Sequence, residues 1–341
     1  MQETTAGNKR RVALWLLILC ALVFAMIVLG GVTRLSGSGL SIVDWRPIMG
    51  VLPPLSQQDW QQTFEMYQQS PEFERVNSRM TVDDFKGIFW LEYLHRLLGR
   101  LIGLAFLVPF VYFLWRGYIR KDELLKYGLM FVLGGLQGVL GWYMVKSGLV
   151  DNPRVSQYRL TAHLLAAIAI YAYMLWIALS LLRSAGAARP HPWFLRTLLL
   201  GVLVLITIIS GGFVAGLDAG LIYNTFPKMG NYWIPPDVTA LSPVWLNSFE
   251  NMAAVQFNHR VLALTTFLII VLYWSFARKS ELPARLRPGV TALLHTAVLQ
   301  VALGISTVLL MVPLVLAAAH QATAVLLLTV VLYLCHGLWR P

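Results

Sequence analysis

The chain has 341 residues, of which 57% are hydrophobic and 13% are charged, against roughly 45–50% and roughly 25% in soluble globular proteins. This balance excludes a disordered chain, which has too little apolar surface to collapse, and it argues against a water-soluble enzyme. The net charge of +11 could indicate nucleic-acid binding or a membrane topology signal, and the placement of the cations decides between the two.

Eight apolar segments are predicted to cross a membrane, because each has about the ~20 residues that a ~30 Å hydrocarbon core requires. In chain order they are residues 12–33, 88–115, 124–146, 158–183, 194–216, 251–276, 289–312 and 315–338. The expected fold class is therefore an all-α integral membrane protein. The first segment is too long for a signal peptide and lacks a cleavage site. Cys20 and Cys335 lie inside apolar segments, so neither a disulfide framework nor a cysteine metal site is expected.

The longest polar stretch is the loop 34–87, which follows the first span. Ser56 and Asp59 in this loop have the spacing of a capping box, which predicts a short helix. One face of that helix carries Trp60, Phe64 and Tyr67. The sequence leaves two interpretations of this face: it lies on the outer membrane surface, or it packs against neighbouring segments. A second capping box, Thr81–Asp84, opens the second span.

Lys and Arg in the short loops predict the orientation of the spans. Most of them fall on one side, at residues 9–11, 116–126, 183–196 and 278–287 and at Arg340. Both termini are therefore expected in the cytoplasm, with the chain in a bacterial inner membrane. Because topology accounts for the excess charge, the predicted surroundings are membrane lipid, with no nucleic-acid partner.

The sequence repeats itself once along its length. The paired motifs are Gly30-Gly31 with Gly211-Gly212, Met49-Gly50 with Met229-Gly230, Glu92–Arg96 with Gln256–Arg260, Gln137 with Gln300, and Thr161–His163 with Ala318–His320. Each half contains four spans, and an even number returns the chain to its starting side, so the halves share one orientation. The predicted architecture is two tandem, parallel-repeat four-helix bundles. Residues 1–183 form the first, 184–196 a cytoplasmic linker and 197–341 the second.

Four histidines occupy equivalent places near the starts of the even-numbered spans: His95, His163, His259 and His320. These spans run from outside to inside, so all four are expected in the outer half of the membrane. A single histidine at this depth could simply bond a neighbouring helix, but four at repeat-related positions favour a functional role. The other three, His191, His295 and His336, lack repeat partners and are interpreted as structural or solvated.

Two imidazoles that face each other inside a helical bundle can ligate haem iron from both axial sides. A zinc site would instead require three or four ligands with carboxylates or thiolates nearby. Arg96 and Arg260 directly follow a histidine and could bind haem propionates, although a snorkelling or helix-pairing arginine is also compatible with the pattern. Gln137 and Gln300 are predicted to form hydrogen bonds between helices.

One position distinguishes the two halves chemically. Glu92 in the first half corresponds to Gln256 in the second. Glu92 precedes His95 by three residues, so both project from one face of the helix. A carboxyl group can exchange protons with a reacting molecule and an amide cannot, so the first half is predicted to perform chemistry. An ion pair between Glu92 and Arg96 is an alternative that does not exclude catalysis.

The first-span stretch 30–41 with Asp44-Trp45 behind it, and the Glu92–Arg96 motif, resemble the haem A synthases (the COX15/CtaA family). The resemblance covers essentially the whole chain. It is closer to the proteobacterial and mitochondrial branch than to the branch with cysteine pairs in its outer loops, since this chain has no such pairs. That family oxidises the C8 methyl of haem O to a formyl group by successive hydroxylations, which gives haem A for terminal oxidases.

The resemblance also implies roles for individual residues. His259 and His320 would ligate a resident haem b, and His95 and His163 would surround the iron of the substrate, haem O. Glu92 matches the essential acidic residue of the family. A haem O synthase would supply the substrate, and the electron acceptor stays open.

Two other functions remain compatible with the residues: a di-haem b-type cytochrome that only transfers electrons, for example with quinone, and a transporter built on a repeat. Electron transfer alone does not require Glu92. A transporter lacks support because no span is interrupted by paired Gly or Pro at its midpoint. The oligomeric state is open, because the glycines of the spans could pack helices within one chain or between chains. The role of Arg34 and the function of the loop 34–87 are also open.

Overall fold

The computed structural model describes residues 6–44, 52–149, 155–183 and 190–339. Within these ranges eight helices are long and apolar enough to cross a membrane, which confirms the eight predicted spans. They are α1 (Ala6–Leu35), α4 (Val82–Trp115), α5 (Leu124–Gly148), α6 (Gln157–Leu182), α7 (Phe194–Gly216), α9 (Met252–Ala277), α10 (Arg287–Leu309) and α11 (Leu314–Trp339). The chain is therefore a multi-pass membrane protein. Trp45, Met49-Gly50 and residues 184–189 of the predicted linker 184–196 lie outside the described residues.

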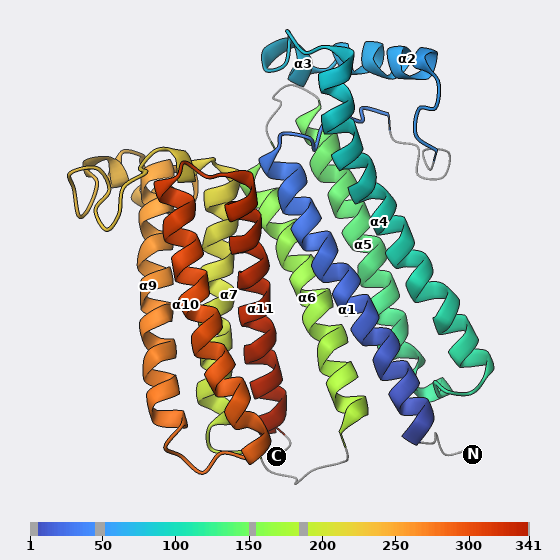
Figure 1. The fold of residues 1–341 in the computed structure, drawn as a ribbon, viewed down its shortest axis with the longest axis vertical. Helices are drawn as coiled ribbons and strands as arrows, with labels where there is room; N and C mark the ends of the chain where they lie inside the picture. The colour runs from blue at the N-terminus through green and yellow to red at the C-terminus, as the bar shows by residue number, and fades with distance from the viewer. Residues whose placement is uncertain (1–5, 45–51, 150–154, 184–189, 340–341) are drawn as a thin grey trace.

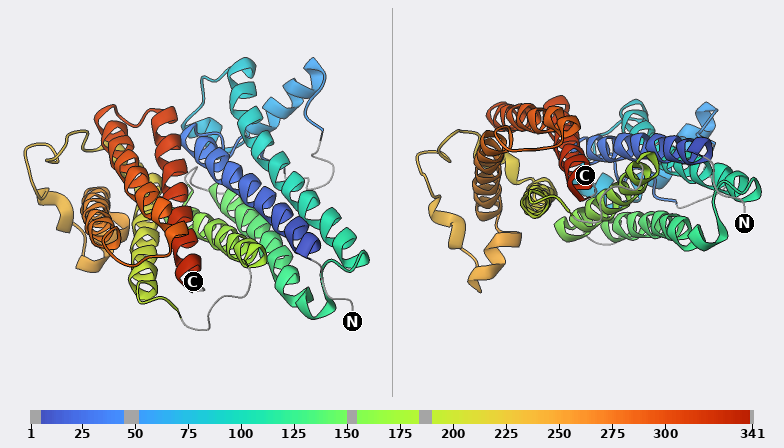
Figure 2. Two further views of the ribbon diagram at one scale, coloured as in Figure 1. Left: turned by 60° about the horizontal axis from the view of Figure 1, so that its bottom comes forward. Right: turned by 90° about the horizontal axis from the view of Figure 1, so that it is seen from below.

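The eight helices pack as two neighbouring groups of four (Figure 1). In the first group α1 packs against α4 and α6, and α5 packs against α4 and α6. In the second group α7 packs against α9 and α11, and α10 packs against α9 and α11. The two groups meet where α6 contacts α7 and α11, and where α1 contacts α11. The first and last helices of each group thus form the centre of the molecule, which Figure 2 shows from two further directions.

Several local features recur at repeat-related positions. Gly37 and Asp218 follow α1 and α7 at equivalent places, and both have a left-handed backbone, with φ of 65° and 56°. Asp is one of the few residues besides Gly that enters this conformation readily. The division at 184–196 and the parallel relationship between the halves stay predictions, and this shared backbone turn supports them.

A short pair of helices, α2 (Gln57–Gln68) and α3 (Pro71–Arg75), lies across one end of the first group (Figure 1). Both predicted capping boxes are present, at Ser56–Asp59 and Thr81–Asp84. The aromatic face of α2 packs against α4, where the ring centroids of Tyr67 and Phe85 are 5.0 Å apart. Of the two interpretations left open by the sequence, the structure supports packing against a neighbouring segment, because α4 extends beyond the bundle and covers this face.

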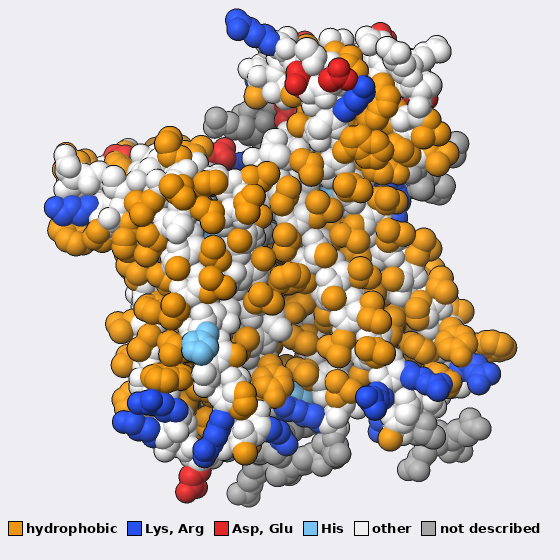
Figure 3. Space-filling model, in the orientation of Figure 1, with side chains coloured by type: hydrophobic (Ala, Val, Ile, Leu, Met, Phe, Trp, Pro, Cys, Tyr) orange, Lys and Arg blue, Asp and Glu red, His pale blue; other side chains and the backbone are white. Residues whose placement is uncertain are grey.

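The other end of the molecule carries both chain termini and is called the terminal end here, in contrast to the α2–α3 end (Figure 1). In Figure 3 hydrophobic side chains cover the middle of the visible face, and Lys and Arg side chains gather towards the terminal end. Large apolar side chains such as Leu104, Val108 and Leu268 are more than half exposed in the middle of their helices. Lipid contact explains this exposure, since such side chains gain nothing from facing water.

Candidate functional site

The four repeated histidines lie on four different helices, α4, α6, α9 and α11, in the half of each helix nearer the α2–α3 end. Each of these residues is largely but not completely buried. The members of each predicted pair are close enough to interact electrostatically, His95 with His163 and His259 with His320. The structure therefore brings together the two pairs that the repeat predicts.

A glycine on the neighbouring helix lies against each histidine ring. A Cβ atom added at Gly304 would lie 2.8 Å from Cε1 of His320, and one at Gly141 would lie 3.0 Å from Cε1 of His163. A Cβ atom added at Gly211 would lie 3.1 Å from Cε1 of His259, and one at Gly30 would lie 3.3 Å from Nε2 of His95. Any larger residue would push the rings away, so these glycines set the positions of the imidazoles.

Both histidines of the C-terminal pair have their Nδ1 atoms engaged. His320 Nδ1 lies 3.2 Å from the carbonyl oxygen of Gln300, which can only accept, so Nδ1 carries the proton. His259 Nδ1 lies 2.8 Å from the hydroxyl oxygen of Ser210. A proton on Nδ1 leaves the lone pair on Nε2, which is the form of imidazole that ligates a metal. The donor set therefore fits the bis-histidine ligation of a haem iron.

The N-terminal pair has no such support within the described ranges. His163 Nδ1 is buried and has no hydrogen-bond partner among the described residues. His95 likewise makes no hydrogen bond to any part of the chain that the structure describes. These two rings are positioned by packing alone, and the unpaired Nδ1 of His163 leaves a polar group for an incoming molecule to satisfy.

Glu92 is almost fully buried on α4, at 2% exposure, and both of its oxygens are paired. Oε1 forms an ion pair with Arg96, with Nη2 at 2.5 Å and Nε at 3.0 Å. Oε2 accepts from the hydroxyl of Ser41 at 2.7 Å and from the backbone N–H of Ile42 at 2.8 Å. The ion pair between Glu92 and Arg96, which the sequence offered as an alternative to a catalytic role, is present. These donors hold the carboxyl group of Glu92 in one orientation.

The second half reproduces this arrangement without the charge. Arg96 donates to the carbonyl of Ile42 at 2.9 Å, and Arg260 donates to the equivalent carbonyl of Tyr223 at 2.7 Å. Where Glu92 accepts from the Ile42 backbone, Gln256 donates its amide N–H to the Tyr223 carbonyl at 3.1 Å. The backbone architecture is shared, so the chemical difference between the halves at this point is the carboxylate itself.

Direct contacts connect the halves close to the histidines. Gln321, which follows His320, packs against Gly31 and donates to the carbonyl of Ile27 on α1 at 2.8 Å. Gly212 stands in the same relation to Thr161, two residues before His163. In each glycine pair, the first glycine therefore contacts a histidine of its own half and the second contacts the other half.

Arg34 adds a further connection at the α2–α3 end. Its guanidinium donates to Oδ1 of Asp218 and to the carbonyl of Ala215 at the end of α7, both at 3.0 Å. A cation at the C-terminal end of a helix also interacts favourably with the helix dipole. Arg34 therefore forms part of the contact between the two halves.

The remaining polar candidates have structural partners. Gln137 donates to the carbonyl of His163 at 2.8 Å, and the Gln300 amide lies 3.4 Å from Nε2 of His320, which confirms that both bridge helices. His336 is buried between Ser180 and Arg183, at 2.9 and 3.1 Å. Its structural interpretation is therefore confirmed.

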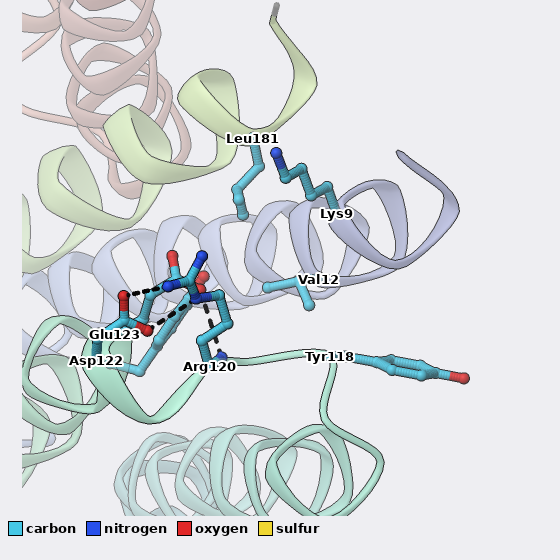
Figure 4. Close-up of a pocket in the computed structure, with 8 residues that line it drawn as sticks. Lys9, Val12, Tyr118, Arg120, Asp122, Glu123 and Leu181 are labelled. Atoms are coloured by element: carbon cyan, nitrogen blue, oxygen red, sulfur yellow. Dashed lines mark hydrogen bonds and ion pairs between the residues drawn. The ribbon is translucent and has the colours of Figure 1, made fainter. Parts of the chain in front are cut away.

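A small pocket of about 180 Å³ lies at the terminal end, between Lys9, Tyr118, Arg120 and Leu181 (Figure 4). Arg120 forms two hydrogen bonds of 2.9 Å with Asp122 at its edge. None of the repeated histidines lines this pocket, which lies at the end of the bundle away from them. We therefore place the candidate site at the histidine pairs.

The roles of Ser41, Ser210 and Gln321 are not predictable from the sequence pattern. Ser41 lies in the motif that carries the family resemblance, but its contact with Glu92 spans 51 positions of the chain. Ser210 and Gln321 are adjacent in sequence to Gly211 and His320, and this adjacency was the one available signal.

Known proteins match this chain along most of its length. Residues 13–332 match the model of a family described as cytochrome oxidase assembly protein. The "Heme A synthase" of Nitrosospira multiformis is 53% identical over 337 residues, which cover 97% of this chain and 94% of that protein. The "Heme A synthase" of Nitrosomonas eutropha is 51% identical, with the same coverage. The "Heme A synthase COX15" of Mus musculus is 47% identical over 97% of this chain and 83% of that protein.

Proposed function

Because the chain belongs to the family of cytochrome oxidase assembly proteins, we propose that it is a haem A synthase, an oxidoreductase that converts haem O to haem A. The bacterial and mammalian relatives described above are named haem A synthases. The reaction converts the C8 methyl of haem O to a formyl group by two successive hydroxylations followed by loss of water. This conversion removes electrons and protons from the substrate, so the protein must accept both.

The single observation that carries the proposal is the carboxylate of Glu92 beside the N-terminal histidine pair. Its counterpart Gln256 has the same backbone surroundings and no charge. We assign substrate haem O to His95 and His163. Glu92 would accept protons from the reacting methyl or stabilise positive charge that develops on its carbon. Arg96 holds this carboxylate in place through their ion pair. We propose that Arg96 also contacts a propionate of the substrate haem.

We assign the C-terminal pair to a resident haem b, which supplies one-electron redox chemistry when bound. The Nδ1 partners of His259 and His320 support this assignment because they leave the lone pair on each Nε2. In His320 this lone pair faces the Gln300 amide at 3.4 Å, which an iron ligand bond would replace. A glycine lies against each of these rings, so no side chain at that position competes with the imidazole for space. We propose that Arg260 contacts a haem propionate, because it directly follows the proposed ligand His259. Its guanidinium reaches the loop between α7 and α9, where it donates to the carbonyls of Thr225 and Tyr223.

We also propose an orientation of the chain in the membrane and the partners that it requires. The excess of Lys and Arg at the terminal end supports cytoplasmic termini in a bacterial inner membrane, with the haem sites towards the outer side. The catalytic half would then be residues 1–183 and the haem b half residues 197–341, joined by the linker. A haem O synthase would deliver the substrate, a separate acceptor would remove electrons, and copies of the chain could associate through their lipid-facing helices.

The test is to express the protein in membranes that contain a haem O source and to separate the extracted haems by chromatography. We expect haem A together with a hydroxylated intermediate. Finding only haems B and O would contradict the enzyme assignment. In parallel, His259→Ala should lose the reduced-minus-oxidised signal of the resident haem, and retention of that signal would contradict the division of roles between the halves.

A further inference from the structure

A serine hydroxyl on α7 connects His259 to the backbone of its neighbouring helix. Ser210 Oγ lies 2.8 Å from His259 Nδ1 and 2.8 Å from the carbonyl oxygen of Thr207. A hydroxyl has a single proton, and a carbonyl oxygen can only accept. When the Ser210 proton goes to the Thr207 carbonyl, the Ser210 oxygen accepts the proton of His259 Nδ1. The Thr207 carbonyl also attracts the proton of this ring, so both acceptors favour the same tautomer. This directional chain fixes which nitrogen of His259 keeps its lone pair.

We propose that Ser210 is a positioning residue that fixes His259 as an Nε2 ligand and tunes the reduction potential of the resident haem. The proposal rests on the assignment of haem b to His259 and His320. An acceptor on Nδ1–H fixes the orientation of the ring and makes the imidazole a stronger electron donor. A stronger donor stabilises ferric over ferrous iron, so the contact lowers the potential.

The first half has no serine hydroxyl at the equivalent position. Leu29 precedes Gly30 as Ser210 precedes Gly211, and a leucine side chain cannot accept a hydrogen bond. His95 and His163 correspondingly have no Nδ1 partner among the described residues. Both ligands of the proposed resident haem are thus anchored, by Ser210 and by the Gln300 carbonyl, and neither histidine of the proposed substrate site is.

This difference follows from what the two haems must do. A resident cofactor gains from ligands that are held in place before it binds, because less orientational entropy is lost. A substrate that must enter and leave as product gains from weaker ligation. The serine-to-leucine difference therefore separates a retaining site from an exchanging site within one repeated fold.

The experiment compares Ser210→Ala and Ser210→Thr with the wild-type protein, purified with its haem. Ser275→Ala is the matched control, because Ser275 also bonds a backbone carbonyl within its helix, at 2.8 Å, and does not contact a repeated histidine. The readouts are the midpoint potential by spectroelectrochemistry and the rate of haem transfer to an excess of apomyoglobin. Neither readout requires haem A formation.

For Ser210→Ala we expect a higher midpoint potential and haem loss faster by about 10-fold, the lower end of the usual effect of removing such a partner. Ser210→Thr keeps a hydroxyl and should stay close to wild type, as should Ser275→Ala. Complete haem loss from Ser210→Ala with retention in Ser210→Thr would also support the proposal. An unchanged potential in Ser210→Ala, or equal changes in the alanine and threonine variants, would overturn it.

Failure of the underlying assignment gives a different result. If the wild-type protein has no bis-histidine haem signal that depends on His259, the resident haem assignment is wrong. If that signal is present and insensitive to the Ser210 hydroxyl, only the role of Ser210 is wrong.

Discussion

The guanidinium of Arg96 and the carboxylate of Glu92 form a buried ion pair one helical turn apart on α4, with 2.5 Å between Nη2 and Oε1. The second carboxylate oxygen is held from a different part of the chain, by Ser41 and Ile42. In the proposed reaction Glu92 therefore has a fixed orientation. Its charge is compensated on one side and its position is fixed on the other.

Arg96→Gln should destabilise the protein, because it leaves the Glu92 carboxylate buried without its cation. Breaking a buried pair by removing one partner costs about 3–5 kcal/mol. The measurement is thermal unfolding in detergent micelles. Adding Glu92→Gln to Arg96→Gln should recover most of the loss, since no buried charge remains. An Arg96→Gln protein as stable as wild type would show that the pair does not stabilise the fold.

Ser41→Ala removes one hydrogen bond to the carboxylate and leaves the Ile42 N–H in place. A hydrogen bond to a charged group contributes about 1.5–3 kcal/mol, so haem A formation should fall by roughly 10-fold or more. The assay is the initial rate of haem A appearance, with resident haem content as a check on folding. Ser147→Ala is the control in the same half, because Ser147 bonds only the Met144 carbonyl. Equal rates in both variants would remove Ser41 from the site.

Gly31→Ala should disturb both halves at once, because an added methyl would collide with the side chain of Gln321. Displacing Gln321 breaks its bond to Ile27 and shifts the residue next to His320, the proposed haem ligand. We expect a loss of about 1–3 kcal/mol in stability and an altered spectrum of the resident haem. Gly134→Ala on α5 meets open space and should be neutral or slightly stabilising. The prediction fails if the two variants behave alike.

The α2–α3 segment should be more stable in mild acid than at alkaline pH. Burial raises the pKa of Glu72 from its ordinary value of 4.5 to about 7. The hydrogen bond from Tyr67 lowers this pKa, and the negative charge of Glu92 raises it. Because the folded pKa exceeds the unfolded one, the folded state binds more protons between pH 4.5 and 7. Stability is then full below the unfolded pKa and falls as pH rises through about 7.

Hydrogen exchange of α2 and α3 between pH 5 and 8, corrected for intrinsic rates, measures this effect. Protection should decrease with pH in the wild-type protein and stay level in Glu72→Gln, which cannot titrate. A wild-type profile that is flat, or that rises with pH, would contradict the assignment.

Local pattern and repetition made much of this protein predictable. Apolar runs of span length identified the eight helices, and the equivalence of the two halves distinguished His95, His163, His259 and His320 from the other three histidines. The contacts that orient these groups were not predictable, because they join distant segments. Ser41 reaches Glu92 from a loop, and no periodicity places Ser210 against Nδ1 of His259. The aromatic face of α2 was ambiguous because packing and membrane contact require the same side chains.

The most direct test of the central claim, that Glu92 performs chemistry which its counterpart Gln256 cannot, is the haem content of Glu92→Gln. The variant is purified from membranes that contain haem O, and its haems are extracted and separated beside those of the wild type. We predict an unchanged amount of haem b and a loss of haem A of about 100-fold or more, because the charged group at the reacting carbon is gone. Wild-type levels of haem A in Glu92→Gln would contradict the account.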